Sequence, residues 1–184
     1  MKDLKTVTKA ITHAGKFHTD DVISTAFLRY FNPNMEVTRV LEYEGTPSDD
    51  EIVFDIGMGE FDHHQEERRF NFVGKPFSAF GLLWEAYGRL YLTEQGFTNV
   101  DEAYQLFTER YVHKIDQGDN EGYKEVKGFY DNQLIIQCNP LWFENADEQK
   151  EMQQFNKAVE LGKQLLEMWT RTIFKETQTH AITF

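Results

Sequence analysis

The stretch of sequence around which the chain is organised reads His13-Ala-Gly-Lys-Phe-His-Thr-Asp-Asp21. It holds two histidines and two aspartates within nine residues, and imidazole together with carboxylate is the ligand set of zinc, manganese and iron sites. His13 and His18 are five residues apart, whereas neighbours on one helical face are three or four apart. We therefore interpret the stretch as a loop at the end of a strand, with His18 and Asp20 at the entry of the following helix.

Apolar patterns on both sides of this stretch predict alternating strands and helices. Residues 6–12 are short and rich in β-branched side chains, which favours a strand. Residues 20–31 carry apolar side chains at helical spacing, and Asn32-Pro33 ends that pattern. Residues 35–43 alternate in part and predict a second strand, while the compact apolar run 52–56 predicts a buried parallel strand.

Helical periodicity dominates the rest of the chain. It predicts helices over residues 78–94, 100–117 and 145–175. Strands that come early, followed by helices, predict an α/β fold with a mainly parallel sheet flanked by helices and a helical C-terminal part. A length of 184 residues is enough for one domain with a substantial core, and we expect one domain over residues 1–184.

Composition limits the classes of function. The formal net charge of −12 argues against a surface that attracts nucleic acid through its overall field. A nucleotide substrate remains open, because two bound dications would return four positive charges at the site itself. The one cysteine, Cys138, cannot form an internal disulfide, and the sequence shows neither a secretory leader nor a long apolar run. We expect a cytoplasmic protein with no membrane partner.

Further acids and histidines follow the predicted strands, where ligands bind in open parallel sheets. Asp55 lies near the end of a core strand, where a carboxylate is costly to bury unless it is paired or coordinated. Adjacent residues in extended backbone point in opposite directions, so at most one of His63 and His64 is expected to bind a metal directly. Asp62 could orient one of them, and Asp116, near a helix end, could add an oxygen. Taken singly, Asp55 and Asp116 are equally well explained as acids that cap or flank their elements.

Together, these positions predict a metal site. Three separate places put Asp or His at strand ends, and the ligands outnumber those of one tetrahedral ion. Mixed nitrogen and oxygen ligands fit two Mn²⁺ ions better than a structural zinc, with Mg²⁺ or Zn²⁺ as alternatives. Two metals about 3.5–4 Å apart are the arrangement that serves in-line displacement at phosphorus.

Five motifs in this order resemble the Myg (melanocyte-proliferating-gene) exonuclease family, within the DHH phosphoesterase superfamily. They span roughly the first two-thirds of the chain, and together they are specific, whereas Asp-His-His alone would not be. The motifs are Thr12-His-Ala-Gly-Lys-Phe-His-Thr-Asp-Asp21, Val53-Phe-Asp-Ile-Gly57, Phe61-Asp-His-His-Gln65, Ser78-Ala-Phe-Gly81 and Lys114-Ile-Asp-Gln-Gly118.

The resemblance implies a set of metal ligands, namely His13, His18, Asp20, Asp55, His63 and Asp116. In that scheme, His13 and His18 bind one ion and Asp20 binds the other. Asp55 bridges the two ions, and His63 and Asp116 complete the second site.

The resemblance also implies residues that act on substrate. His64, next to Asp62, would face the scissile phosphate and either hold it or protonate the leaving oxygen. Lys75 and Ser78 would contact substrate at the start of a helix. For Lys75, a solvated loop lysine is the alternative.

The leading hypothesis is a two-metal phosphoesterase that acts on nucleotides or short single-stranded nucleic acid, with a 3′–5′ exonuclease as its sharpest form. Proteins of the resembled family continue beyond this length, so we expect that the half that closes the cleft over substrate is absent. A non-catalytic metal-binding or regulatory domain is therefore the alternative, and a metal-dependent amide hydrolase is a third. A homo-oligomer is a further expectation.

Overall fold

The structure is a computed structural model that describes residues 1–140 and 147–178. Its elements are β1 (Lys9–His13), α1 (Thr19–Phe31), β2 (Glu36–Val40), β3 (Glu51–Val53), α2 (Ala79–Glu94), α3 (Val100–Phe107), the π-helical turn η1 (Thr108–Val112), α4 (His113–Glu121), the 3₁₀ turn η2 (Tyr123–Glu125), α5 (Asp131–Ile136) and α6 (Glu148–Gln178). Across the described residues, no helix combines the length and the apolar character needed to cross a membrane.

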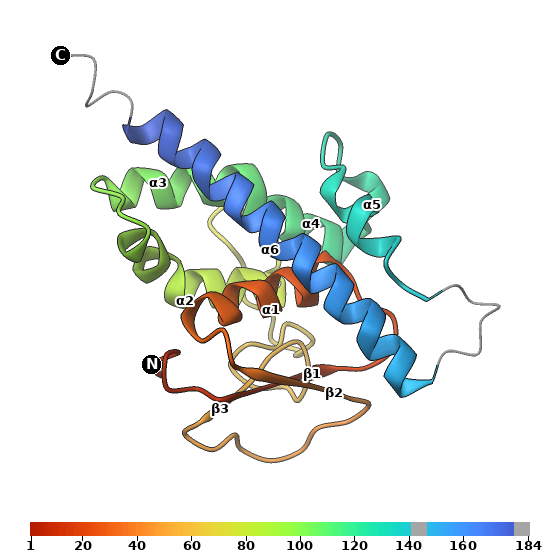
Figure 1. Cartoon of the computed structure of the whole chain (residues 1–184). Helices are drawn as coiled ribbons and strands as arrows, with labels where there is room; N and C mark the ends of the chain where they lie inside the picture. The colour runs from red at the N-terminus through yellow and green to blue at the C-terminus, as the bar shows by residue number, and fades with distance from the viewer. Residues whose placement is uncertain (141–146, 179–184) are drawn as a thin grey trace.

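The three strands form a parallel sheet in the order β2-β1-β3. Ala10 of β1 pairs with Val37 on one side and with Ile52 on the other, and all three side chains are buried. Figure 1 shows the helices gathered above the sheet, while the chain between β2 and β3 passes below it. The predicted α/β class, with a parallel sheet, flanking helices and a helical C-terminal part, is confirmed.

Several predicted boundaries differ from the structure, and one lies outside the described residues. The strand predicted over residues 52–56 already ends at Val53, because the backbone at Asp55 turns to a φ of 57°. The helix predicted over residues 100–117 continues through a π-helical turn to Glu121. The last helix is described from Glu148 to Gln178, and the predicted start at residue 145 lies outside the described residues.

Aromatic packing fixes α1 against α2. The Phe27 ring of α1 contacts the Phe80, Trp84 and Tyr91 rings of α2, with centroids 5.4–5.8 Å apart. On the other side of α1, Gly162 of α6 lies so close that a Cβ there would be 3.0 Å from Val22 Cγ1. Helix α1 is thereby packed between α2 and α6.

Candidate metal centre

The turn between β1 and α1 carries the first polar side chains of the site. His13 is the last residue of β1, and Gly15 turns the chain with a φ of 85°. His18 then caps α1, and its backbone N–H donates to Asp21 Oδ1 over 2.8 Å. The other oxygen of Asp21 lies 3.5 Å from His13 Nε2.

Asp20 joins the starts of two helices. Its side chain is fully buried, and its two oxygens accept hydrogen bonds from the backbone N–H groups of Ala79 (3.1 Å) and Phe80 (2.6 Å) at the first turn of α2. A helix N-terminus stabilises an anion of this kind. Asp20 Oδ2 also lies 3.8 Å from His63 Nε2.

Asp55 lies between two imidazoles. Its Oδ2 is 3.1 Å from His13 Nε2, and its Oδ1 is 3.1 Å from His63 Nε2. The backbone at Asp55 is left-handed, with a φ of 57°, a conformation that aspartate and asparagine adopt more readily than most residues other than glycine. Asp55 is therefore the side chain that links the two parts of the cluster.

The cluster contains three overlapping groups of potential ligand atoms, each within 4.8 Å. They are His13 with Asp21 and Asp55; Asp20 with His63 and Asp119; and Asp55 with His63 and His64. Asp119 comes from α4, and its Oδ2 is 2.8 Å from His63 Nε2. The structure thus brings together four of the six predicted metal ligands, namely His13, Asp20, Asp55 and His63, and adds Asp21 and Asp119.

The donor atoms fit divalent ions. Among the described residues, Asp21 Oδ2, Asp55 Oδ1 and His63 Nε2 are buried without a hydrogen-bond partner, and buried polar atoms seldom stay unsatisfied. Carboxylate oxygens and imidazole nitrogens are ligands for manganese and zinc. The groups contain four carboxylates, whose charge two dications would neutralise if the imidazoles are neutral.

The electrostatics of the clustered side chains also favour added positive charge. Burial alone would raise the pKa of Asp55, but the His13 and His63 imidazoles, each 3.1 Å from one of its oxygens, outweigh burial and hold that pKa at about 2. Burial likewise opposes protonation of the two imidazoles, yet the neighbouring carboxylates raise the pKa of His13 to about 9 and that of His63 to about 11. Burial raises the pKa of Asp21 to about 7. Protons on the imidazoles thus offset negative charge that metal ions would otherwise neutralise.

His64 lies at the exposed side of the cluster. Its Nδ1 is 2.6 Å from Asp62 Oδ1, and its side chain is 56% exposed. Asp62 is buried and accepts a second hydrogen bond from the Met58 backbone N–H over 2.7 Å. The His64 ring lies over the His63 ring at a centroid distance of 4.1 Å. Asp62 therefore fixes the orientation of the His64 ring, where the sequence left open which of the two histidines it would contact.

Two predicted metal ligands belong to none of the three groups. The His18 ring stacks on Tyr123 at a centroid distance of 6.1 Å, belongs to none of the three groups, and has its pKa lowered by burial. Asp116 is inside α4 rather than near a helix end, and its oxygens accept hydrogen bonds from Ser78 N (2.9 Å), Ser78 Oγ (2.8 Å) and Asn71 Nδ2 (2.8 Å). Asp116 thus secures α2 and the loop before it, and Asp119, one helical turn later, contributes to the cluster instead.

The two predicted substrate contacts are also engaged with protein groups. Ser78 is fully buried and caps α2 by accepting from the Gly81 backbone N–H over 3.0 Å. Lys75 Nζ pairs with Glu121 over 2.6 Å. Neither residue lines the cavity beside the cluster.

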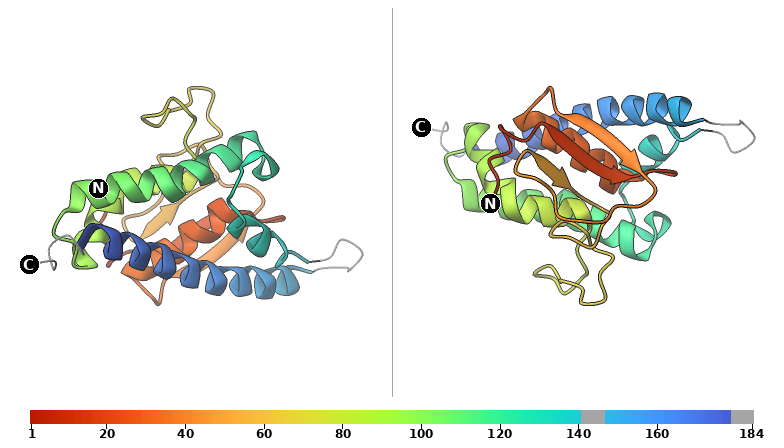
Figure 2. Two further views of the ribbon diagram at one scale, coloured as in Figure 1. Left: turned by 90° about the horizontal axis from the view of Figure 1, so that it is seen from above. Right: turned by 90° about the horizontal axis from the view of Figure 1, so that it is seen from below.

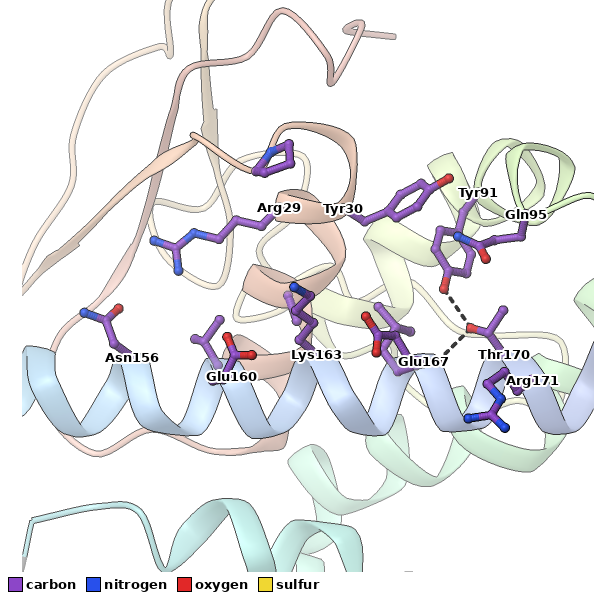
Figure 3. A pocket seen from close by; sticks show the side chains of 14 residues that line it. Arg29, Tyr30, Tyr91, Gln95, Asn156, Glu160, Lys163, Glu167, Thr170 and Arg171 are labelled. Carbon is purple, nitrogen blue, oxygen red and sulfur yellow. Dashed lines mark hydrogen bonds between the residues drawn. The ribbon is translucent and has the colours of Figure 1, made fainter.

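A cavity of about 640 Å³ opens beside the cluster. Its lining includes His13, His18, Asp55, His64 and Asp119. A separate cavity of about 660 Å³ lies between the C-terminal ends of α1 and α2 and the helix α6 (Figure 3). Side chains of both charge signs line that second cavity, and none of the clustered residues does.

Comparison with known proteins shows that this chain is similar to MYG1 proteins. It is 30% identical to mouse MYG1 exonuclease over 179 residues and 29% identical to the rat MYG1 exonuclease, covering 82% of this chain and 46% of each relative. It is 25% identical over 186 residues to the MYG1 protein C694.04c of Schizosaccharomyces pombe, covering 86% of this chain and 56% of that protein. The chain thus spans about half the length of the curated relatives it matches, and no solved structure matches it significantly.

A family model matches far more of the chain than the five motifs do. Residues 9–182 match the MYG1_exonuc model, which is described as an uncharacterised protein family (UPF0160). The matched region includes every residue of the cluster. The chain therefore belongs to the MYG1_exonuc family.

Proposed function

We propose that the chain is a phosphoesterase of the DHH superfamily that uses two divalent ions, with Mn²⁺ as the first choice and Mg²⁺ or Zn²⁺ as alternatives. The observation that carries the proposal is the position of Asp55, whose two oxygens lie 3.1 Å from His13 and 3.1 Å from His63. A carboxylate held between two sets of nitrogen and oxygen ligands suits a bridge between two ions.

The two ions would be held by overlapping sets of residues. His13 and Asp21 would hold one ion, and Asp20, His63 and Asp119 would hold the other, with Asp55 shared by both. Divalent ions at these positions would polarise phosphoryl oxygens and lower the pKa of a water molecule. Hydrogen bonds from α2 to Asp20 and from the His18 backbone to Asp21 fix the orientation of these carboxylates.

His64 is the residue we assign to proton transfer. Asp62 fixes its ring through Nδ1, which leaves Nε2 for a group in the cavity. A positioned imidazole contributes about 10²–10⁴-fold to such reactions. We propose that His64 holds the scissile phosphate or gives a proton to the leaving oxygen.

The names of the relatives suggest the class of substrate. The mouse and rat relatives are named exonucleases, and we propose a nucleotide or a short single-stranded nucleic acid, cleaved from the 3′ end, as the substrate of this chain. A net charge of −12 favours a short substrate over a long polynucleotide, because binding of a polynucleotide depends on Lys and Arg contacts to many phosphates.

Hydrolysis of a simple diester tests the proposal. Purified protein with Mn²⁺ should release nitrophenolate from bis(p-nitrophenyl) phosphate and mononucleotides from an oligonucleotide. His63→Ala should abolish both, because His63 lies within 3.8 Å of Asp20, Asp55 and Asp119. If no substrate in a broad panel is cleaved, and wild type and His63→Ala behave alike, the enzymatic proposal is lost.

A non-catalytic metal-binding or regulatory domain is the second candidate. It is favoured by the pairing of basic residues near the cluster, where Arg69 and Lys75 both pair with glutamates. It predicts that Mn²⁺ raises the melting temperature while no turnover occurs with any phosphodiester.

A further inference from the structure

The cavity beside the cluster has one fixed positive charge. The acidic and basic side chains that line it are three aspartates (Asp55, Asp62 and Asp119), four histidines and one arginine. Among the described residues that line it, Arg68 is the one lysine or arginine. The chain has 31 acidic and 19 basic residues, so an arginine beside a cluster of aspartates is a candidate for binding an anionic ligand.

The basic residues next to Arg68 in the sequence have other partners. Arg69 pairs with Glu85, and its guanidinium lies 5.5 Å from the centre of the Phe77 ring. Lys75 pairs with Glu121 over 2.6 Å. Within the part of the chain that the structure describes, no hydrogen bond or ion pair engages the Arg68 side chain. Of these three residues, Arg68 is thus the one whose charge is available to a ligand.

The loop that carries Arg68 is held in place. Figure 2 shows the segment between β3 and α2 extending away from the sheet and helices. Its base is fixed by a hydrogen bond from Phe77 N to Arg69 O over 3.1 Å and by one from Asn71 Nδ2 to Asp116 Oδ2 over 2.8 Å. Arg68 immediately precedes the first of these bonds. The backbone of Arg68 is thereby positioned at the edge of the cavity, while its side chain is not fixed by a hydrogen bond or ion pair to any described residue.

We propose that Arg68 binds the phosphate group of the substrate and positions it over the cluster. The guanidinium presents a planar fork that matches two oxygens of one phosphate, which an ammonium group cannot do. The inference rests on the proposed function, because it assumes that the cavity receives a phosphoester. It also assigns a role to residues 66–77 of this segment, which provide none of the predicted metal ligands.

Equilibrium binding of thymidine 5′-monophosphate tests the inference. Calorimetry in saturating Mn²⁺ should show Arg68→Ala weakened about 10- to 100-fold relative to wild type, which is the range for a charged hydrogen-bonding pair. Arg68→Lys should fall between the two, since it keeps the charge and loses the fork. Arg69→Ala is the matched control, because it removes the same charge one residue away, outside the cavity lining, and should bind as wild type does. Mn²⁺ affinity should be the same in all four proteins.

The outcomes separate this inference from the proposed function. The inference is overturned if Arg68→Ala binds the monophosphate as tightly as wild type, if Arg69→Ala weakens it equally, or if wild type does not bind it. The proposed function is judged independently, by whether wild type hydrolyses bis(p-nitrophenyl) phosphate and Asp55→Asn does not. Arg68→Gln repeats the test with a side chain that stays polar, should Arg68→Ala fold poorly.

Discussion

Asp55→Asn should remove most of the Mn²⁺ affinity while leaving the fold intact. The substitution keeps the size of the side chain, and asparagine tolerates the left-handed backbone that Asp55 adopts at a φ of 57°. It removes the negative charge that faces both His13 and His63 at 3.1 Å. Mutation of groups that only support a ligand typically lowers metal affinity about 10- to 100-fold, so a shared carboxylate should account for at least about 100-fold.

The size of the effect can be expressed as thermal stability. At a free Mn²⁺ concentration of about 100 times the wild-type Kd, binding stabilises the folded state by about 2.7 kcal/mol. A variant with about 100-fold weaker affinity would gain only about 0.4 kcal/mol at that concentration. For a domain of this size, about 1 kcal/mol corresponds to roughly 2–4 °C. Mn²⁺ should therefore raise the melting temperature of wild type by roughly 5–11 °C and that of the variant by about 1 °C.

The assay is thermal unfolding with and without Mn²⁺, combined with calorimetric titration. Asp49→Asn is the matched control, since it removes the same charge from an exposed turn that contributes no residue to the cluster. It should respond to Mn²⁺ as wild type does. The reasoning is refuted if Asp55→Asn binds Mn²⁺ within about threefold of wild type, because a bridging carboxylate cannot be replaced at so small a loss.

Three further predictions concern other parts of the site. His64→Ala should keep its metal content and lose about 10²–10⁴-fold in turnover; parallel loss of metal in elemental analysis would instead make His64 a ligand. Asp116→Ala should lower the free energy of unfolding in urea by about 3 kcal/mol or more, because three buried donors lose their acceptor; a change under about 1 kcal/mol would contradict this. Mn²⁺ affinity should rise with pH between about 6 and 9, because an ion must displace the protons that His13 and His63 otherwise hold. The pKa of His13 is about 9 and that of His63 about 11. A flat calorimetric profile over that pH range would exclude such displacement.

Local patterns predicted the elements that position the cluster. The β-branched run before His13 and the apolar stripe after Asp20 correspond to β1 and α1, and the stripe after Ser78 corresponds to α2. Side chains that follow strands in the sequence meet at one place because parallel strands end at the same edge of a sheet. That rule predicts from the sequence that His13 and Asp55 lie together. His63 lies well beyond the end of β3, and the bridge between Phe54 and Phe61 brings it back to the cluster.

The choice between Asp116 and Asp119 depends on tertiary packing. Gly118 suggests a helix end, but it lies inside α4, where a Cβ would stand 2.2 Å from the Tyr123 ring. The glycine is needed for that ring to pack, and the helix continues far enough to carry Asp119 to His63. The spacing of three residues places Asp119 on the same helical face as Asp116, a signal that is lost when the helix is expected to end at residue 117.

The different partners of Asp20 and Asp21 in α1 also could not be predicted from local sequence patterns. Asp20 reaches the N-terminus of α2, some 60 residues away in the sequence, and Asp21 turns toward His13. A sequence shows two carboxylates side by side, and only the packing of α1 against α2 decides which of them meets which partner. For the same reason His18, which the sequence presents as a ligand, is a partner for Tyr123.

The central claim is a pair of ions that share Asp55, and an anomalous difference map tests it most directly. Crystals grown with Mn²⁺ and measured at the manganese absorption edge should show two peaks about 3.5–4 Å apart. One peak should lie beside His13 and Asp21, the other beside Asp20, His63 and Asp119, with Asp55 next to both. A single peak, or peaks that do not contact Asp55, would contradict the account.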